Sequence, residues 1–110
     1  MKQYVIDELR FQDYEKIRAY LDMNFGAAEI GGIYWIPLDP DTLTDVQKAH
    51  TGCQPFYFAI ELEEGRIACE LLVRTQNKIR CDCISYADET QRNWFIRRVD
   101  AMFDELEIKI

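Results

Sequence analysis

A single histidine and four cysteines are the residues of this chain best suited to bind a metal or to act as nucleophiles. They occur as His50-x-x-Cys53, Cys69 and Cys81-x-Cys83. Imidazole and thiolate groups are the usual ligands of tetrahedral zinc, so the set is large enough for one site. The spacing is unlike that of common structural zinc sites, whose cysteines come in pairs separated by two to four residues. Cys81-x-Cys83 instead fits a β-strand, on which both side chains point to the same face.

Three interpretations of the cysteines stay open. The sheet register predicted below places Cys69 opposite Cys83, so three thiols would gather in the apolar layer beneath the helices, where free cysteine behaves as a small hydrophobic residue. We favour this interpretation and expect no cofactor. The first alternative is a metal site formed by these residues and His50. The second is a Cys69–Cys83 disulfide, which opposed strand positions would allow and which a reducing compartment would make labile.

Thiol catalysis has little support in the sequence. His50 is the only imidazole available to act as a base, and no third group that would orient it can be identified beside Cys53. The motifs G-x-x-x-x-G-K-[ST], G-x-G-x-x-G, H-E-x-x-H and G-x-S-x-G are absent from the sequence, which removes the main indications of nucleotide-dependent and hydrolytic enzymes. We therefore expect no catalytic residues.

The composition indicates one folded, acidic domain. The chain has 110 residues, is 48% hydrophobic and carries a formal net charge of −7. This charge opposes binding to nucleic acid, whose phosphates require clustered cations. No apolar stretch is long enough to span a bilayer, and the first residues include acids where a signal peptide would be apolar. We expect a cytoplasmic protein with reduced thiols.

Hydrophobic periodicity predicts an α+β fold. Capping boxes, in which a residue at the helix start and a Gln three places later bond each other's backbone, are expected at Thr44–Gln47 and at Asp88–Gln91. The predicted elements are helices at about 13–25, 44–50 and 89–106, and strands at about 33–37, 56–63, 66–74 and 79–87.

The last three predicted strands form a meander whose register can be argued from its apolar face. Pairing Ile60 with Cys69 also pairs Phe56 with Val73, and the following loop then places Cys69 opposite Cys83. A shift by one residue would turn every one of these side chains to the other face. The helices at 13–25 and 89–106 are expected to cover the apolar face, while the partner of strand 33–37 is left open.

The opposite face of the meander is predicted to be the interaction surface. It is expected to carry Tyr57, Leu72, Arg74, Arg80, Ile84 and Tyr86. Aromatic and aliphatic side chains with arginine at the rim are typical of protein interfaces, and a symmetric homodimer is the simplest partner. Strand 33–37 or a chain end folding over this face is the alternative.

We therefore expect a non-catalytic protein-interaction or dimerisation module. A metal-binding or thiol-dependent protein centred on His50, Cys53 and the strand cysteines is one alternative. A chaperone-like binder of partner polypeptides is the other.

Overall fold

The computed structural model describes residues 1–28 and 30–109 and confirms the predicted α+β fold, with three α-helices and an antiparallel sheet of six strands. The chain runs in the order β1 (Gln3–Ile6), α1 (Phe11–Phe25), β2 (Ile33–Pro37), α2 (Asp45–Ala49), β3 (Phe56–Glu63), β4 (Arg66–Glu70), β5 (Leu72–Thr75), β6 (Ser85–Tyr86) and α3 (Glu89–Glu105). Short 3-10 turns at Pro40–Thr42 and Thr51–Cys53 flank α2. Among the described residues, no helix combines the length and the apolar character needed to cross a membrane.

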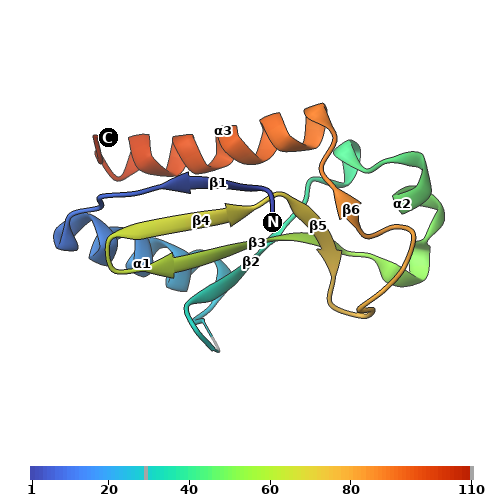
Figure 1. Ribbon diagram of the computed structural model, residues 1–110, viewed down its shortest axis with the longest axis horizontal. Coiled ribbons are helices and arrows are strands. Elements are labelled where there is room, and N and C mark those ends of the chain that lie inside the picture. Colours follow the sequence, from blue (N-terminus) through green and yellow to red (C-terminus); the bar gives the residue numbers. More distant parts are fainter. Residues whose placement is uncertain (29, 110) are drawn as a thin grey trace.

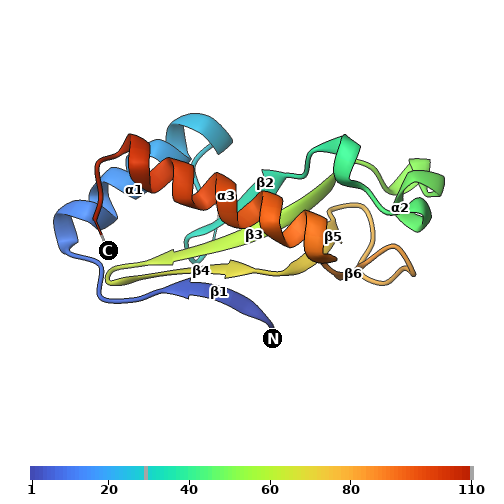
Figure 2. The same ribbon diagram turned by 90° about the horizontal axis from the view of Figure 1, so that it is seen from above.

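The helices α1 and α3 lie on the same side of the sheet, as predicted (Figures 1 and 2). Their apolar residues recur every three or four positions, so each helix turns one stripe toward the sheet. Ile17 and Leu21 of α1 and Phe95 and Val99 of α3 are at most 2% exposed. Phe95 stacks on Phe58 of β3, with ring centroids 4.1 Å apart and ring planes within 7°. This layer is the hydrophobic core.

The strand β3 is the centre of the sheet, since β2, β4 and β5 all pair with it. The sequence left the partner of segment 33–37 open; this segment is β2, and it lies along β3 with Trp35 opposite Ala59. It is therefore part of the sheet and does not fold over the outer face. The N-terminal strand β1 pairs with β4 and places Tyr4 opposite Cys69.

The predicted register is correct for one half of the β3 hairpin and wrong for the other. Ile60 pairs with Cys69, as expected. Phe56, however, pairs with Thr75 and not with Val73. The offset is two residues, so the alternation of faces survives, and Val73 remains fully buried.

The offset arises at Leu71, between β4 and β5. Its N–H donates to the carbonyl of Lys2 at 3.0 Å, and its carbonyl accepts from the N–H of Ala87 at 2.8 Å. The backbone of Leu71 therefore bonds the chain before β1 and the chain after β6, and the hairpin partner is displaced at this point. An irregularity of this kind depends on contacts distant in sequence and has no signature in the local apolar pattern.

The predicted strand 79–87 is also wrong over most of its length. Only Ser85–Tyr86 forms a strand, with Leu72 opposite Tyr86, while residues 76–84 form a loop. As a result Cys83 does not lie opposite Cys69. The loop instead turns toward α2, at the right-hand end of the molecule in Figure 1.

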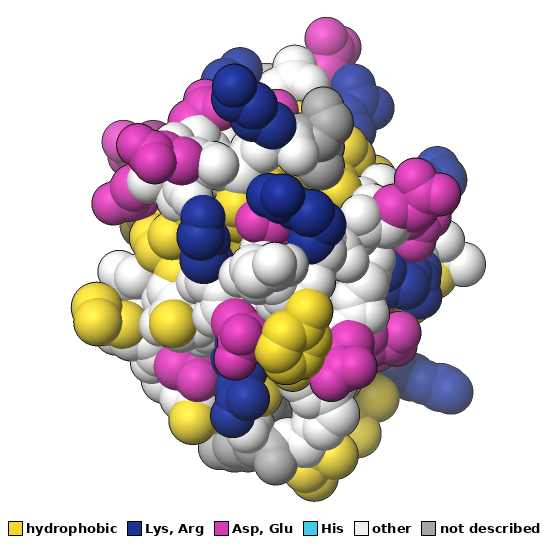
Figure 3. All heavy atoms as spheres, turned by 90° about the vertical axis from the view of Figure 1, so that its left-hand side faces the viewer, with side chains coloured by type: hydrophobic (Ala, Val, Ile, Leu, Met, Phe, Trp, Pro, Cys, Tyr) yellow, Lys and Arg dark blue, Asp and Glu magenta, His cyan; other side chains and the backbone are white. Residues whose placement is uncertain are grey.

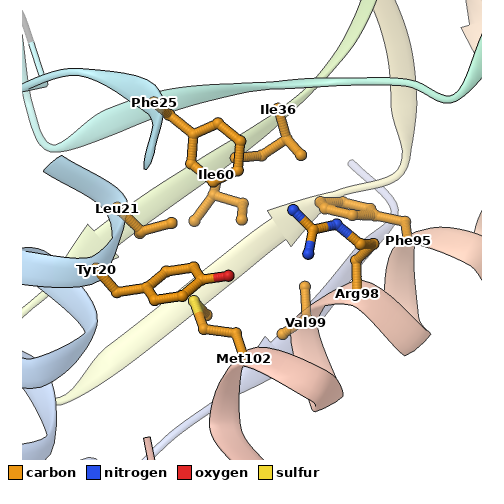
Figure 4. A pocket seen from close by; sticks show the side chains of 9 residues that line it. All are labelled: Tyr20, Leu21, Phe25, Ile36, Ile60, Phe95, Arg98, Val99 and Met102. Atoms are coloured by element: carbon orange, nitrogen blue, oxygen red, sulfur yellow. The ribbon is translucent and has the colours of Figure 1, made fainter. Parts of the chain in front are cut away.

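The seam between α1 and α3 is almost filled by side chains. Tyr20, Leu21, Arg98 and Met102 approach one another there from the two helices (Figure 4). The remaining cavity measures about 20 Å³, which is room for about one water molecule. The seam thus leaves no room for a ligand much larger than water. On the end of the molecule shown in Figure 3, basic and acidic side chains are interspersed, as on an ordinary solvated surface.

Candidate metal centre

Four of the five residues considered as metal ligands come together in space. The ligand atoms of His50, Cys53, Cys81 and Cys83 all lie within 4.8 Å of one another. His50 Nδ1 is 3.1 Å from Cys81 Sγ. Two ligands come from the end of α2 and the turn after it, and two come from the loop between β5 and β6, which lie together in both ribbon views (Figures 1 and 2).

The first ligand pair is positioned by α2. The Thr44–Gln47 capping box predicted from the sequence is present and starts this short helix. The helix ends at His50, whose N–H donates to the carbonyls of Val46 and Gln47. The next turn continues directly, because Cys53 N–H donates to the His50 carbonyl at 3.0 Å. Three-residue spacing across this tight turn brings the imidazole and the thiol to the same side.

The second ligand pair is positioned by a loop that is bonded at both ends. At its start, the buried hydroxyl of Thr75 donates to the Cys53 carbonyl. At its end, Ile84 N–H donates to the Cys81 carbonyl at 3.0 Å, which closes a turn around residues 82 and 83. Both cysteines therefore reach the same cluster although they do not belong to a strand.

The cysteines of the cluster differ in their surroundings. Cys83 is 1% exposed, whereas Cys81 is half-buried. The pKa of Cys81 is lowered to about 7, chiefly by hydrogen bonds from the backbone N–H and the thiol of Cys83. Burial is the main reason that the pKa of Cys83 is raised to about 12. Of these two cysteines, Cys81 is therefore the one that more readily becomes a thiolate.

Cys69 does not belong to the cluster. It is fully buried in the core between Tyr4 and Ile60 of the neighbouring strands. Burial, with a smaller effect of the Asp100 carboxylate, raises its pKa to about 12. The expected grouping of Cys69 with the other strand thiols is therefore wrong, and Cys69 and Cys83 are both free thiols.

The cluster is surrounded by buried polar residues that were not predicted as part of the site. The buried polar side chains among the described residues are Asp13, Gln47, Thr75 and Gln91. Three of these four lie around the cluster: Thr75 bonds Cys53, and the buried amide of Gln47 bonds both the Cys83 carbonyl and Gln91. The sequence feature that could have indicated these buried residues is the Gln in each of the two capping boxes, because an amide side chain can be buried without burying a charge.

Only four of the six residues of the predicted interaction surface lie on one face of the sheet. By alternation along the strands, Tyr57, Leu72 and Arg74 lie on the sheet face opposite the buried core residues, together with Tyr86, the partner of Leu72. Two members do not belong to this face. Arg80 is exposed in the loop 76–84, and Ile84 packs against the core.

Comparisons with known proteins give no match. No family model matches the sequence, and neither the curated proteins nor the solved structures show significant similarity to it.

Proposed function

We propose that this protein is a zinc-binding domain in which His50, Cys53, Cys81 and Cys83 hold one structural metal ion. The observation that supports this is the convergence of four ligand atoms within 4.8 Å of one another. A zinc–sulfur bond of about 2.3 Å places neighbouring sulfurs of a tetrahedron about 3.8 Å apart. Small side-chain rotations therefore suffice to complete the coordination.

The donor set favours zinc and a structural role. Three thiolates and an imidazole are soft or intermediate ligands, which prefer Zn²⁺ to Mg²⁺ or Ca²⁺. Four protein ligands also leave no position for a water or a substrate, and this is the difference between structural and catalytic zinc sites. The ligands join the end of the short helix α2 to the loop 76–84, so the ion would hold this end of the molecule together. Ligation requires reduced thiols, consistent with the cytoplasmic location that we propose.

Metal analysis of purified protein tests this proposal. Protein prepared with zinc and without chelator is expected to contain about one zinc per chain, and Cys83→Ser is expected to lose it. Cys69→Ser is the matched control, because Cys69 and Cys83 are equally buried and both have a pKa raised to about 12. The control should retain the full zinc content. Less than about a tenth of an equivalent in the wild-type protein, or equal loss in both variants, would contradict the proposal.

A second candidate function is protein binding or homodimerisation through the outer sheet face. It is favoured by the position of α1 and α3, which both lie on the other side of the sheet (Figure 2). The outer face carries partly exposed Tyr57 and Leu72, and Tyr86 is 42% exposed. Apolar surface of this kind beside Arg74 resembles the composition of protein interfaces.

A charge placed on this face tests the second candidate. Leu72→Glu should abolish a dimer detected by light scattering or sedimentation. Met23→Glu should leave it intact, because Met23 is an exposed apolar residue of α1, which lies on the other side of the sheet. A strictly monomeric wild-type protein, or a dimer that survives Leu72→Glu with the fold intact, would count against self-association through this face.

A further inference from the structure

The loop that carries Cys81 and Cys83 is held by one side chain from α2. The amide nitrogen of Gln47 donates to the Cys83 carbonyl at 3.1 Å. Gln47 is fully buried, so this bond is shielded from competition with water. The bond joins residues 36 positions apart, and its acceptor belongs to the same residue that supplies a sulfur ligand. The orientation of the Cys83 peptide is therefore set by α2.

The main chain of Gln47 also positions the other ligand pair. Its carbonyl accepts from His50 N–H at 3.2 Å, at the point where α2 ends. One residue thus bonds the segment of His50 and Cys53 through its backbone and the segment of Cys81 and Cys83 through its side chain. Besides the direct contact of His50 with Cys81, Gln47 thus links the two halves of the cluster.

The amide of Gln47 also contacts a second buried amide. Gln91, at the start of α3, donates to Gln47 Oε1 at 2.8 Å and to the Thr42 carbonyl at 3.1 Å. Gln47 Oε1 also accepts from Thr44 N–H at 3.0 Å, which completes the capping box of α2. The Thr44 donor alone is enough to orient the oxygen, so the Gln47 nitrogen points at the Cys83 carbonyl whether or not Gln91 is bonded to it.

We infer that Gln47 is the positioning residue of the metal site, acting on the ligands through the Cys83 carbonyl and the end of α2. This inference rests on the proposed zinc function. Groups that hydrogen-bond metal ligands from outside the coordination sphere typically change metal affinity about 10–100-fold when they are lost. Gln47 acts one step further out, because it bonds the backbone carbonyl of a ligand residue, and its own amide oxygen is already occupied by two donors.

The paired variants Gln47→Met and Gln91→Met test the inference. Each replaces a buried amide by an uncharged side chain of similar length, and each removes three side-chain hydrogen bonds. Gln47→Met loses the bonds to Thr44, Cys83 and Gln91. Gln91→Met loses the bonds to Asp88, Thr42 and Gln47. The two variants are thus matched in lost bonds, and only Gln47→Met removes the contact with a ligand residue.

Zinc affinity, measured by competition with a chromophoric chelator, should fall about 10–100-fold in Gln47→Met and less than about threefold in Gln91→Met. The visible absorption of the cobalt-substituted protein should change shape in Gln47→Met and match the wild type in Gln91→Met. A general loss of stability would not produce this difference, because thermal unfolding should be affected similarly in both variants.

A third variant keeps the inference testable if Gln47→Met does not fold. Gln47→Glu retains the oxygen that accepts from Thr44 and Gln91 and, in its ionised form, replaces the donor to Cys83 by a second acceptor, so ionised Gln47→Glu should also weaken zinc binding about tenfold or more. Equal affinities of the Gln47 and Gln91 variants, with the wild type binding one zinc, would overturn the inference and leave the proposed function standing. A wild-type protein without affinity for zinc would overturn both.

Discussion

The turn before β2 provides a quantitative test of the fold, because two neighbouring glycines there have similar φ angles but differ in what an added Cβ would meet. Gly31 has φ +64° and Gly32 has φ +69°, both in the left-handed region. A Cβ added at Gly31 would meet no atom within 4 Å, whereas one added at Gly32 would lie 2.4 Å from the Leu62 carbonyl oxygen. Leu62 N–H donates to the Gly32 carbonyl at 2.9 Å, so this close approach belongs to the pairing of β2 with β3.

Alanine at either position should lower the free energy of unfolding, and by different amounts. The left-handed conformation alone costs about 1–2 kcal/mol, partly offset because alanine also restricts the unfolded chain. Gly31→Ala should therefore destabilise by about 1 kcal/mol. Gly32→Ala must in addition displace backbone and weaken a ladder hydrogen bond, for a total of about 3 kcal/mol.

Urea unfolding followed by circular dichroism measures both values, and the slope of the transition shows whether the unfolded state has changed. If the two variants differed by less than about 0.5 kcal/mol, the close approach of Gly32 to β3 would be refuted.

Two further predictions concern ionisable groups. In metal-free protein, the rate at which iodoacetamide alkylates Cys81 should be half-maximal near pH 7 and fall about tenfold per pH unit below it. Cys69 and Cys83 should react far more slowly. Mass spectrometry of the peptides measures this order of reaction, and a faster reaction of Cys83 would contradict the prediction. Because the folded pKa of Cys81 lies below the ordinary value of 9.0, its contribution to stability is complete above pH 9 and is lost as the pH falls through 7. Tyr34→Phe should lower the free energy of unfolding by about 1 kcal/mol, because the Tyr34 hydroxyl donates to Asp22 at 2.6 Å in a part-buried site. Tyr4→Phe, which removes a more exposed bond to Asp100, should cost less than about 0.5 kcal/mol in the same assay, and an equal loss in both variants would contradict this assignment.

Features encoded by local pattern were predictable from the sequence. The period of apolar residues identified α1 and α3, the β-branched and aromatic run identified β2, and the capping boxes at Thr44 and Asp88 are both present. The pairing of Ile60 with Cys69 followed from the apolar face of the hairpin. These features depend on residues close in sequence or on simple alternation.

Features that depend on distant contacts were not predictable in the same way. The two-residue offset lies where Leu71 bonds Lys2 and Ala87, which are outside the hairpin in sequence. The apolar alternation from Ile79 onward resembled a strand, although residues 76–84 form a loop that turns toward His50 and Cys53. The ligand types were visible in the sequence, but the exclusion of Cys69 and the role of Gln47 became visible only with the path of this loop.

Every third residue from Thr44 to Cys53 has a distinct role. Thr44 caps α2, Gln47 hydrogen-bonds the Cys83 carbonyl, and His50 and Cys53 have ligand atoms in the cluster. The segment forms the short helix α2 and then a 3-10 turn, and residues three apart lie on the same side of both. It defines a compact signature, T-x-x-Q-x-x-H-x-x-C followed later by C-x-C, that a distant relative could retain after the rest of its sequence had diverged. The same ten residues, with a C-x-C loop as their counterpart, form a natural unit to transplant into another scaffold.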